Sequence, residues 1–224
     1  MIAVPERSAE RDTAIDALLP NVPFDGWTYL ALGHGLAAAG GDPRDAEILF
    51  PNGAADMIEA YCDLADRRME EGVATLDLAA LRTPERVRAI IALRLVQNRP
   101  HKEAIRRALA ALALPGRARV ATACTTRTVD AIWHAAGDRS VDVSWYTKRA
   151  ILAGVYTATV LYWLRDPGGD PGGDPGGDPG DDEAATLAFL DRRLADVGRI
   201  TGWRRRFTNA LGCVVPSSLR SQSP

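Results

Sequence analysis

Apolar residues recur every three or four positions along most of this chain, which is the spacing of amphipathic α-helices. Met57, Tyr61 and Leu64, for example, fall on one helical face. No segment shows the alternation of a half-buried strand, so the pattern predicts an all-α protein. After three short helices near the N-terminus, we expect longer helices over these approximate ranges: 53–71, 83–98, 105–114, 116–136, 143–165 and 181–212.

The segment TPERVRAIIALRLVQN has the signals of a helix start. It begins with Thr83 as the predicted cap, followed by a proline in the first turn and by Glu85. The stripe behind these residues includes Val87, Ile90 and Ile91. We therefore expect a well-defined helix that begins here and buries one face.

The stretch from Ala150 to Leu164 contains no charged residue. Fifteen residues rise only about 22 Å in a helix, which is short of the roughly 30 Å hydrocarbon core of a membrane. A helix that is apolar all round is expected to be buried on every side. It is either a core or dimer helix or the wall of a cavity for a lipid tail, and periodicity does not separate the two.

A helix, a turn at a Gly-Gly pair and a second helix give residues 21–60 a helix-turn-helix layout, similar to the N-terminal domain of TetR-type transcriptional regulators. The charges argue against DNA. This segment has six acids and one base, for a net charge of −5, and the second helix holds Asp42, Asp45 and Glu47. Such a surface repels phosphates, so we interpret the unit as a vestigial helix-turn-helix that serves packing.

The whole chain of 224 residues is 46% hydrophobic and 25% charged, with a net charge of −2, so no basic field indicates nucleic acid. The three cysteines, Cys62, Cys124 and Cys213, are far apart in sequence and are expected to be reduced thiols. The N-terminal segment has neither a signal core nor transit-peptide character. These features predict a cytoplasmic protein.

No set of residues has the spacing of a catalytic motif. The three histidines lie in different segments, and neither a phosphate-binding loop nor a nucleophile elbow is found in the sequence. Asp and Arg residues scattered along the helices are interpreted as solvated faces. The sequence therefore predicts a protein that is not an enzyme, with no metal and no cofactor.

The block VDAIWHAAGD, followed by SVDVSWYTKRAILAGVYTATVLYWLRD, resembles the signature of the ubiquinone biosynthesis accessory family. The resemblance extends from about Thr13 to Ile200. It implies a TetR-regulator-like helical bundle that does not bind DNA, forms a homodimer, and holds an isoprenoid quinone or another lipid in an apolar pocket. Candidate lipid-binding residues come from this block: Ile132, Trp133, Ile151, Leu152, Val155, Tyr156, Thr159, Tyr162 and Trp163.

The same resemblance implies a surface that docks the demethoxyubiquinone hydroxylase. Carried over to this sequence, the docking residues are Asp142, Trp145, Tyr146 and Arg149. Trp, Tyr and Arg are the residue types most frequent in binding hot spots, which agrees with that role.

The segment 200–212 combines arginines with aromatic residues. An Arg-rich amphipathic helix of this kind is able to lie on an anionic membrane, although packing on the protein is an equal alternative. Peripheral contact with the cytoplasmic face of the inner membrane is thus a further expectation. The candidate membrane-binding residues are Trp203, Arg204, Arg205, Arg206 and Phe207.

The expected organisation has three parts. Residues 1–70 form the helix-turn-helix-like part, 71–212 the helical lipid-binding and dimerisation part, and 213–224 a disordered tail. The repeat DPGGDPGG in 166–182 is expected to be a disordered linker, and it departs from the family, which has a shorter link there.

The sequence thus predicts a non-catalytic protein that binds isoprenoid quinone intermediates and presents them to the hydroxylase. Two alternatives stay open at this point. One is a TetR-like, ligand-responsive transcriptional regulator, and the other is an enzyme of lipid metabolism.

Overall fold

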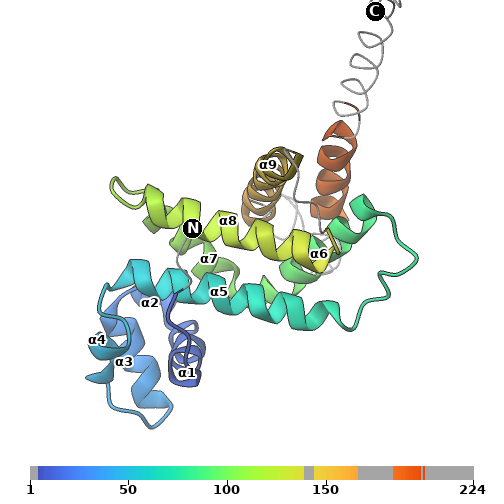
Figure 1. The fold of residues 1–224 in the computed structure, drawn as a ribbon. Coiled ribbons are helices and arrows are strands. Elements are labelled where there is room, and N and C mark those ends of the chain that lie inside the picture. The colour runs from blue at the N-terminus through green and yellow to red at the C-terminus, as the bar shows by residue number, and fades with distance from the viewer. Residues whose placement is uncertain (1–4, 139–143, 166–183, 198, 200–224) are drawn as a thin grey trace, which may run out of the picture.

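The computed structural model describes residues 5–138, 144–165, 184–197 and 199. Every regular element in these residues is a helix, which confirms the all-α prediction (Figure 1). Residues 184–197 are also helical. The other elements are α1 (Ala9–Leu18), α2 (Val22–Asp25), α3 (Tyr29–Ala38), α4 (Asp45–Leu49), α5 (Ala54–Val73), α6 (Thr83–Asn98), the short 3-10 helix η1 (Arg99–His101), α7 (Lys102–Leu112), α8 (Ala118–Ala135) and α9 (Ser144–Arg165).

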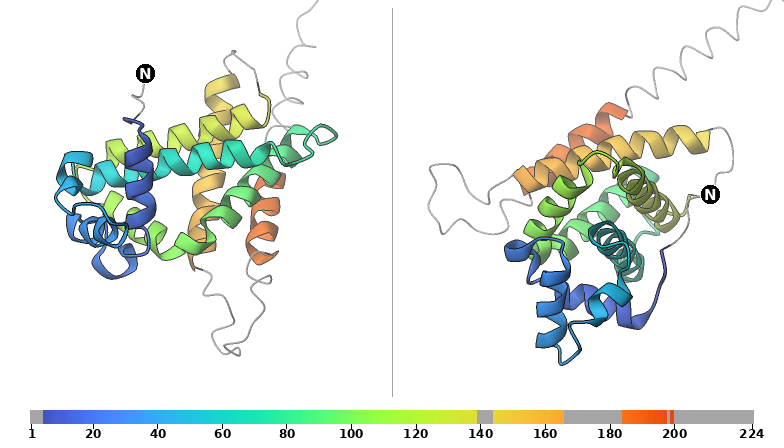
Figure 2. Two further views of the ribbon diagram at one scale, coloured as in Figure 1. Left: turned by 90° about the horizontal axis from the view of Figure 1, so that it is seen from below. Right: turned by 90° about the vertical axis from the view of Figure 1, so that its left-hand side faces the viewer.

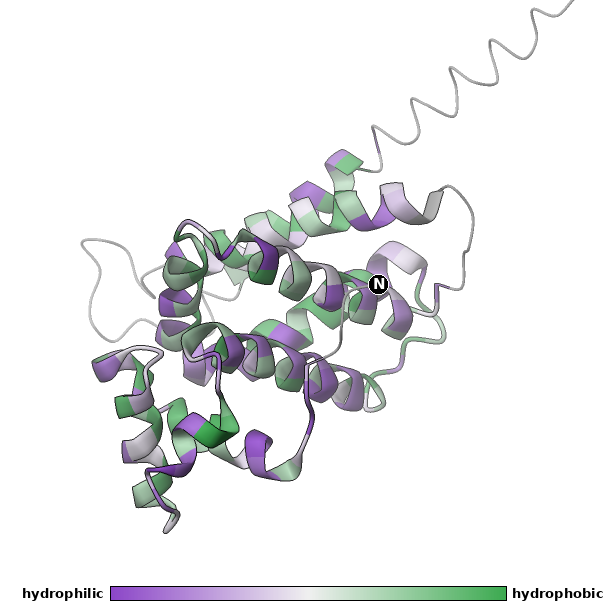
Figure 3. Ribbon diagram, turned by 60° about the vertical axis from the view of Figure 1, so that its left-hand side comes forward, coloured by the Kyte–Doolittle hydropathy of each residue, from purple (hydrophilic) through white to green (hydrophobic). Residues whose placement is uncertain are grey.

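The helices are stacked in layers around α5. The N-terminal helices lie on one side of α5 and α8 on another, while α9 and residues 184–197 lie side by side beyond α8 (Figures 1 and 2). Hydrophobic and hydrophilic residues are interspersed along the helices in Figure 3. Each helix therefore has an apolar face to bury and a polar face for solvent, as the sequence pattern predicts.

The N-terminal helices are fixed by caps and by one close approach. The side chains of Ser8 and Thr28 accept hydrogen bonds from the backbone N–H groups of Arg11 and Ala31, at the starts of α1 and α3. At Gly35 a Cβ atom would lie 2.2 Å from a backbone oxygen of α1. Only glycine lets α3 pack this closely on α1.

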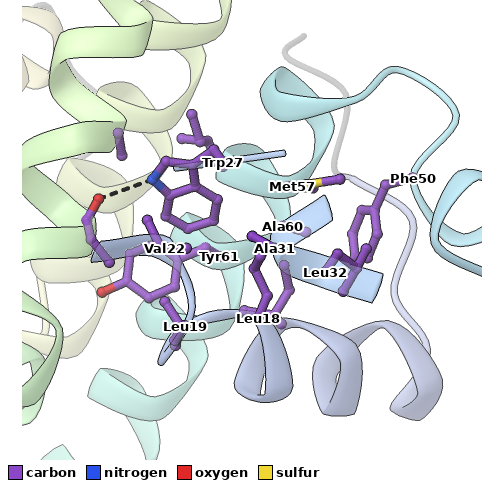
Figure 4. Close-up of a cluster of buried hydrophobic side chains, with 14 of the residues drawn as sticks. Leu18, Leu19, Val22, Trp27, Ala31, Leu32, Phe50, Met57, Ala60 and Tyr61 are labelled. Carbon is purple, nitrogen blue, oxygen red and sulfur yellow. Dashed lines mark hydrogen bonds between the residues drawn. The ribbon is translucent and has the colours of Figure 1, made fainter. Parts of the chain in front are cut away.

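A first core cluster joins these helices to α5 and α7. Leu18, Leu32, Phe50 and Met57 are fully buried in it (Figure 4). The indole N–H of Trp27 donates a hydrogen bond of 3.0 Å to a backbone oxygen of α7, which is the dashed line in Figure 4. The N-terminal part is thus continuous with the rest of the core.

The helix-turn-helix layout is present, with a very short second helix. A glycine at φ +81°, Gly40, turns the chain after α3, and α4 has only five residues. Asp42, Asp45 and Glu47 are all exposed, so this end of the molecule presents acids to solvent. That agrees with the interpretation of the unit as one that serves packing.

α5 has the predicted apolar face, with Met57, Tyr61 and Leu64 buried. Its last turns reach a second core cluster through Met69. The boundary predicted near residue 70 therefore falls inside one continuous helix, and the division into two parts stays a prediction.

The start of α6 differs in one detail from the prediction. Thr83 is the first residue of the helix, and Arg82 occupies the cap position. The Glu85 carboxylate accepts a 2.9 Å hydrogen bond from the backbone N–H of Arg82. The carboxylate thereby satisfies the backbone N–H of the cap residue. The cap is therefore one residue earlier in the chain than the predicted Thr83.

α9 packs on α8 and contributes Leu152, Val155 and Trp163 to the second core cluster. The expectation that this helix is buried on every side is wrong, because Gly154 and Leu161 are exposed. The neighbouring helices cover only part of its circumference. None of the helices searched within the described residues is long and apolar enough to cross a membrane.

Candidate functional site

A cavity of about 310 Å³ lies among α5, α6, α7, α8 and α9. This volume is at the lower end of the roughly 300–1,000 Å³ typical of small-molecule sites. Its wall has an apolar stretch and a polar end. The lining residues lie on five successive α-helices, from Ile58 to Val160, so only the packed fold brings them together.

The apolar stretch is formed mainly by α7. Ile105, Leu109 and Leu112 contribute to the wall from this helix, together with Ile58 of α5 and Val160 of α9. Ile105, Leu109 and Leu112 are spaced by four and three positions, so they belong to the apolar stripe from which α7 was predicted. The stripe therefore packs in the core and also lines the cavity. The part of the wall that it forms is suited to hydrocarbon.

Arg94 is the centre of the polar end. Its Nε donates a 2.8 Å hydrogen bond to the hydroxyl of Tyr156, and its Nη1 lies 2.7 Å from Oδ1 of Asp66 as an ion pair that lacks hydrogen-bond alignment. The Thr128 hydroxyl donates to the other Asp66 oxygen at 3.1 Å. This network connects α5, α6, α8 and α9.

Asp66 and Arg94 are 6% and 4% exposed. The interpretation of helical Asp and Arg residues as solvated faces is therefore wrong for this pair. Each charge compensates the other, which makes burial tolerable for both. No local sequence pattern indicates this ion pair, because the two residues lie on different helices.

A second polar contact lies beside the first. The Tyr61 hydroxyl donates a 3.0 Å hydrogen bond to the side-chain oxygen of Asn98, and both residues line the cavity. Asn98 follows Arg94 by one helical turn on α6, which places both side chains on one face. The polar end thus combines a guanidinium, an amide and two phenols.

Burial dominates the electrostatics of this end. It raises the pKa of Asp66 to about 6, although Arg94 and Thr128 act in the opposite direction. Burial also disfavours the charged form of Arg94, but the nearby Asp66 outweighs that effect and raises its pKa. Burial raises the pKa values of Tyr61 and Tyr156 as well. Both phenols therefore keep their protons at neutral pH and remain hydrogen-bond donors.

Two cysteines line the cavity together, which the sequence did not reveal. Cys62 of α5 and Cys124 of α8 are free thiols, as predicted, and they interact with one another. The hydrogen bond with Cys124, followed by burial, raises the pKa of Cys62, and the same bond lowers the pKa of Cys124. Cys213 lies outside the described residues.

Of the nine candidate lipid-binding residues, Tyr156 lines the cavity. The other α9 residues in the wall are Thr157 and Val160. The remaining candidates lie elsewhere on α8 and α9. Buried in helix packing are Ile132, Leu152, Val155, Thr159 and Trp163. Trp133 and Ile151 are half-buried against the second core cluster, and the half-buried Tyr162 stacks on Phe189.

The candidate docking residues are partly described. Tyr146, near the start of α9, is 74% exposed. Arg149 forms an ion pair with Asp130 of α8 and borders an open, charged groove of about 460 Å³. Asp142 and the side chain of Trp145 lie outside the described residues. So do the candidate membrane-binding residues Trp203, Arg204, Arg205, Arg206 and Phe207.

The described residues contain no group of three or more His, Cys, Asp or Glu side chains that could hold a metal ion.

The fold is that of the TetR class of regulators. The structure matches a TetR transcriptional regulator from Nitrosomonas europaea with a TM-score of 0.62, covering 84% of this chain and 97% of that protein. The sequence identity is 19%, so the likeness concerns the fold alone.

The COQ9 family model matches residues 118–171, which contain α8 and α9. "Ubiquinone biosynthesis protein COQ9, mitochondrial" of Rattus norvegicus is 31% identical over 189 residues, or 81% of this chain and 56% of the rat protein. The human protein of the same name is 32% identical over 159 residues, or 68% of this chain and 50% of the human protein. The chain belongs to the COQ9 family, as its resemblance over 129–166 predicted. It spans about half the length of these curated relatives.

Proposed function

We propose that this protein is a non-catalytic lipid-binding accessory protein of ubiquinone biosynthesis. It binds isoprenoid quinone intermediates and presents them to the demethoxyubiquinone hydroxylase. The relatives are named as ubiquinone biosynthesis proteins, which supports the pathway. The observation that supports lipid binding is the cavity of about 310 Å³, whose wall includes residues of the family-matched segment.

The wall of this cavity has the chemistry that a lipid requires. Its apolar stretch removes hydrocarbon from water, which stabilises a bound chain by roughly 25 cal/mol for each Å² buried. A small number of polar groups at one end is typical of sites that also fix the orientation of their ligand. An amphipathic lipid with an oxygen-bearing head suits both regions.

The exposed aromatic residue near the start of α9 supports docking of the hydroxylase. Tyr146 is 74% exposed in the predicted docking segment. Exposed Tyr and Trp residues are frequent anchors in interfaces, because they bury a large area at low cost in side-chain entropy.

The alternative function is that of a ligand-responsive transcriptional regulator, which the fold favours. The exposed acids Asp42, Asp45 and Glu47 on the helix-turn-helix disfavour it. Homodimerisation and membrane contact through 203–207 remain predictions, as does a cytoplasmic location.

Organic extraction and mass spectrometry of the purified protein test lipid binding. We expect isoprenoid quinone intermediates to be enriched relative to an unrelated soluble protein from the same host. In Leu109→Trp the larger side chain should fill the apolar stretch and remove that enrichment. Ala38→Trp, at an exposed position of α3, should retain it.

Circular dichroism spectra of both variants show whether they keep the fold. Equal lipid content in a folded Leu109→Trp and in the wild-type protein would place lipid outside this cavity. No lipid in any sample would contradict the proposed function.

A further inference from the structure

The polar residues of the cavity lie at its deep end. Arg94 and Asn98 are 4% and 9% exposed, whereas Ala113 and Thr157 of the same lining are exposed to solvent. Ala113 follows the last turn of α7, and Thr157 lies on α9. The cavity therefore opens between α7 and α9 and closes against α6.

Three groups at the deep end still have donor hydrogens to offer. Among the described residues, we find no acceptor for Nη2 of Arg94, for the hydroxyl hydrogen of Tyr156 or for the side-chain nitrogen of Asn98. The acceptor oxygens beside them already receive hydrogen bonds from Arg94 and Tyr61. The two nitrogens are not among the fully enclosed polar atoms that lack a partner, so they are accessible from the cavity, and a ligand group that is rich in acceptors would satisfy all three donors.

The deep end is also close to electrically neutral. Asp66 compensates the charge of Arg94 at 2.7 Å, and the two phenols keep their protons. A carboxylate or phosphate would bring an uncompensated charge into a buried site, which is costly. Carbonyl and ether oxygens accept hydrogen bonds without a charge, so they suit this environment better.

The mouth of the cavity has the opposite character. Leu114 and Leu161 are 54% and 48% exposed, and each directly follows a lining residue, Ala113 or Val160. A cavity of about 310 Å³ holds a ligand of small-molecule size, so a long polyprenyl chain has to extend beyond it. The two leucines offer apolar surface where such a chain would emerge.

We propose that the cavity binds an isoprenoid quinone head first. The carbonyl and methoxy oxygens of the ring accept hydrogen bonds from Arg94, Asn98 and Tyr156, and the polyprenyl chain leaves between α7 and α9 past Leu114 and Leu161. This inference rests on the lipid-binding function proposed above, and it adds the orientation of the ligand and the residues that select its head. The enclosed ring must then leave the cavity before a partner enzyme modifies it.

Two matched probes test head recognition in the full chain. One is 2,3-dimethoxy-5-methyl-6-decyl-1,4-benzoquinone, and the other is decylbenzene, which has a similar chain and ring but no acceptor oxygens. Equilibrium dialysis measures both affinities. Tyr156→Phe should weaken binding of the quinone about five-fold, the equivalent of one lost hydrogen bond, and leave decylbenzene unchanged.

The ratio of the two affinities separates recognition from general damage to the fold. Asn98→Leu should lower the affinity for the quinone relative to that for decylbenzene, as Tyr156→Phe does. Val160→Ala, in the apolar stretch, should weaken both probes equally and keep the ratio. A ratio that is unchanged in both polar variants would overturn head recognition while lipid binding stands. If neither probe binds the wild-type protein, the proposed function fails too.

Photo-crosslinking tests the orientation itself. A diazirine at the end of the decyl chain should label the peptides around Leu114 or Leu161. A diazirine on the ring should label those around Tyr61 or Asn98. The reverse distribution would overturn the head-first arrangement.

Discussion

Asp66 shows how a single residue of this protein responds to its surroundings. It lies between Arg94 and Thr128, with Asp63 and Arg127 contributing weaker effects. Burial raises its pKa from 3.8 to about 6. Asp66 therefore stays ionised at neutral pH, where it holds Arg94, but it gains a proton under mildly acidic conditions.

This shift predicts a pH dependence of stability. Between pH 4 and 6 the folded state holds the Asp66 proton more tightly than the unfolded state does. The contribution of Asp66 to the free energy of unfolding is therefore largest at low pH and falls by about 3 kcal/mol as the pH rises through 6. Urea denaturation from pH 3.5 to 7 measures this contribution as the difference in pH dependence between the wild-type protein and Asp66→Asn.

Asp66→Asn leaves Arg94 without its countercharge and should be less stable at neutral pH, so the pH dependence is the informative quantity. Asp16→Asn, at an exposed ion pair with Arg68, is a matched control and should follow the wild-type curve. Parallel curves for the wild-type protein and Asp66→Asn would show that Asp66 titrates normally.

At the scale of helices, the segment 184–197 is attached to the molecule by a few specific contacts. The rings of Tyr162 and Phe189 stack with their centroids 4.5 Å apart, and Arg88 of α6 pairs with Asp191 at 2.5 Å. Leu190 is fully buried in the second core cluster. This helix therefore docks onto both α9 and α6.

Removal of the stacked ring should loosen this helix locally. We expect Phe189→Ala to destabilise the docked helix by roughly 1–3 kcal/mol, from lost burial and lost stacking. Amide hydrogen exchange should accelerate in 184–197 and stay unchanged in α1 and α3. Phe24→Ala, at an exposed position of α2, should alter neither region. Uniform acceleration across the chain would mean that the helix does not open independently.

At the scale of the whole molecule, the cavity and the predicted docking segment both involve α9. Tyr146 lies near the start of this helix, and Tyr156 lines the cavity further along it. One helix therefore connects the lipid site with the surface proposed for the hydroxylase. A partner bound at the start of α9 would contact an element of the cavity wall.

The double substitution Trp145→Ala and Tyr146→Ala tests this surface. Loss of two aromatic anchors should weaken binding of the hydroxylase about 30-fold, the equivalent of roughly 2 kcal/mol. Isothermal titration calorimetry measures the affinity, and retained lipid binding would show that the cavity is intact. Phe24→Ala removes an exposed aromatic residue elsewhere and should have no effect. Unchanged affinity in the double variant would refute the docking assignment.

The sequence by itself determined the helices, because apolar spacing and capping residues act over a few neighbouring positions. It predicted the all-α class, the buried face of α5 and the acidic second helix of the helix-turn-helix, and the block 129–166 indicated the family. The apolar character of α9 left a core helix and a cavity wall both open, and only the family resemblance implied a lipid pocket lined by this helix. These features depend on local periodicity, local charge or a long characteristic segment.

Only the tertiary structure decided which side chains meet. The rotation of α9 about its axis sets Tyr156, Thr157 and Val160 into the cavity wall, while most of the candidate residues pack elsewhere. Asp66 forms an ion pair with Arg94 of another helix, and Cys62 likewise contacts Cys124 of another helix. Such contacts depend on the order and angle in which helices stack. Periodicity shows that a helix has an apolar face, but it does not show which neighbour or cavity that face will meet.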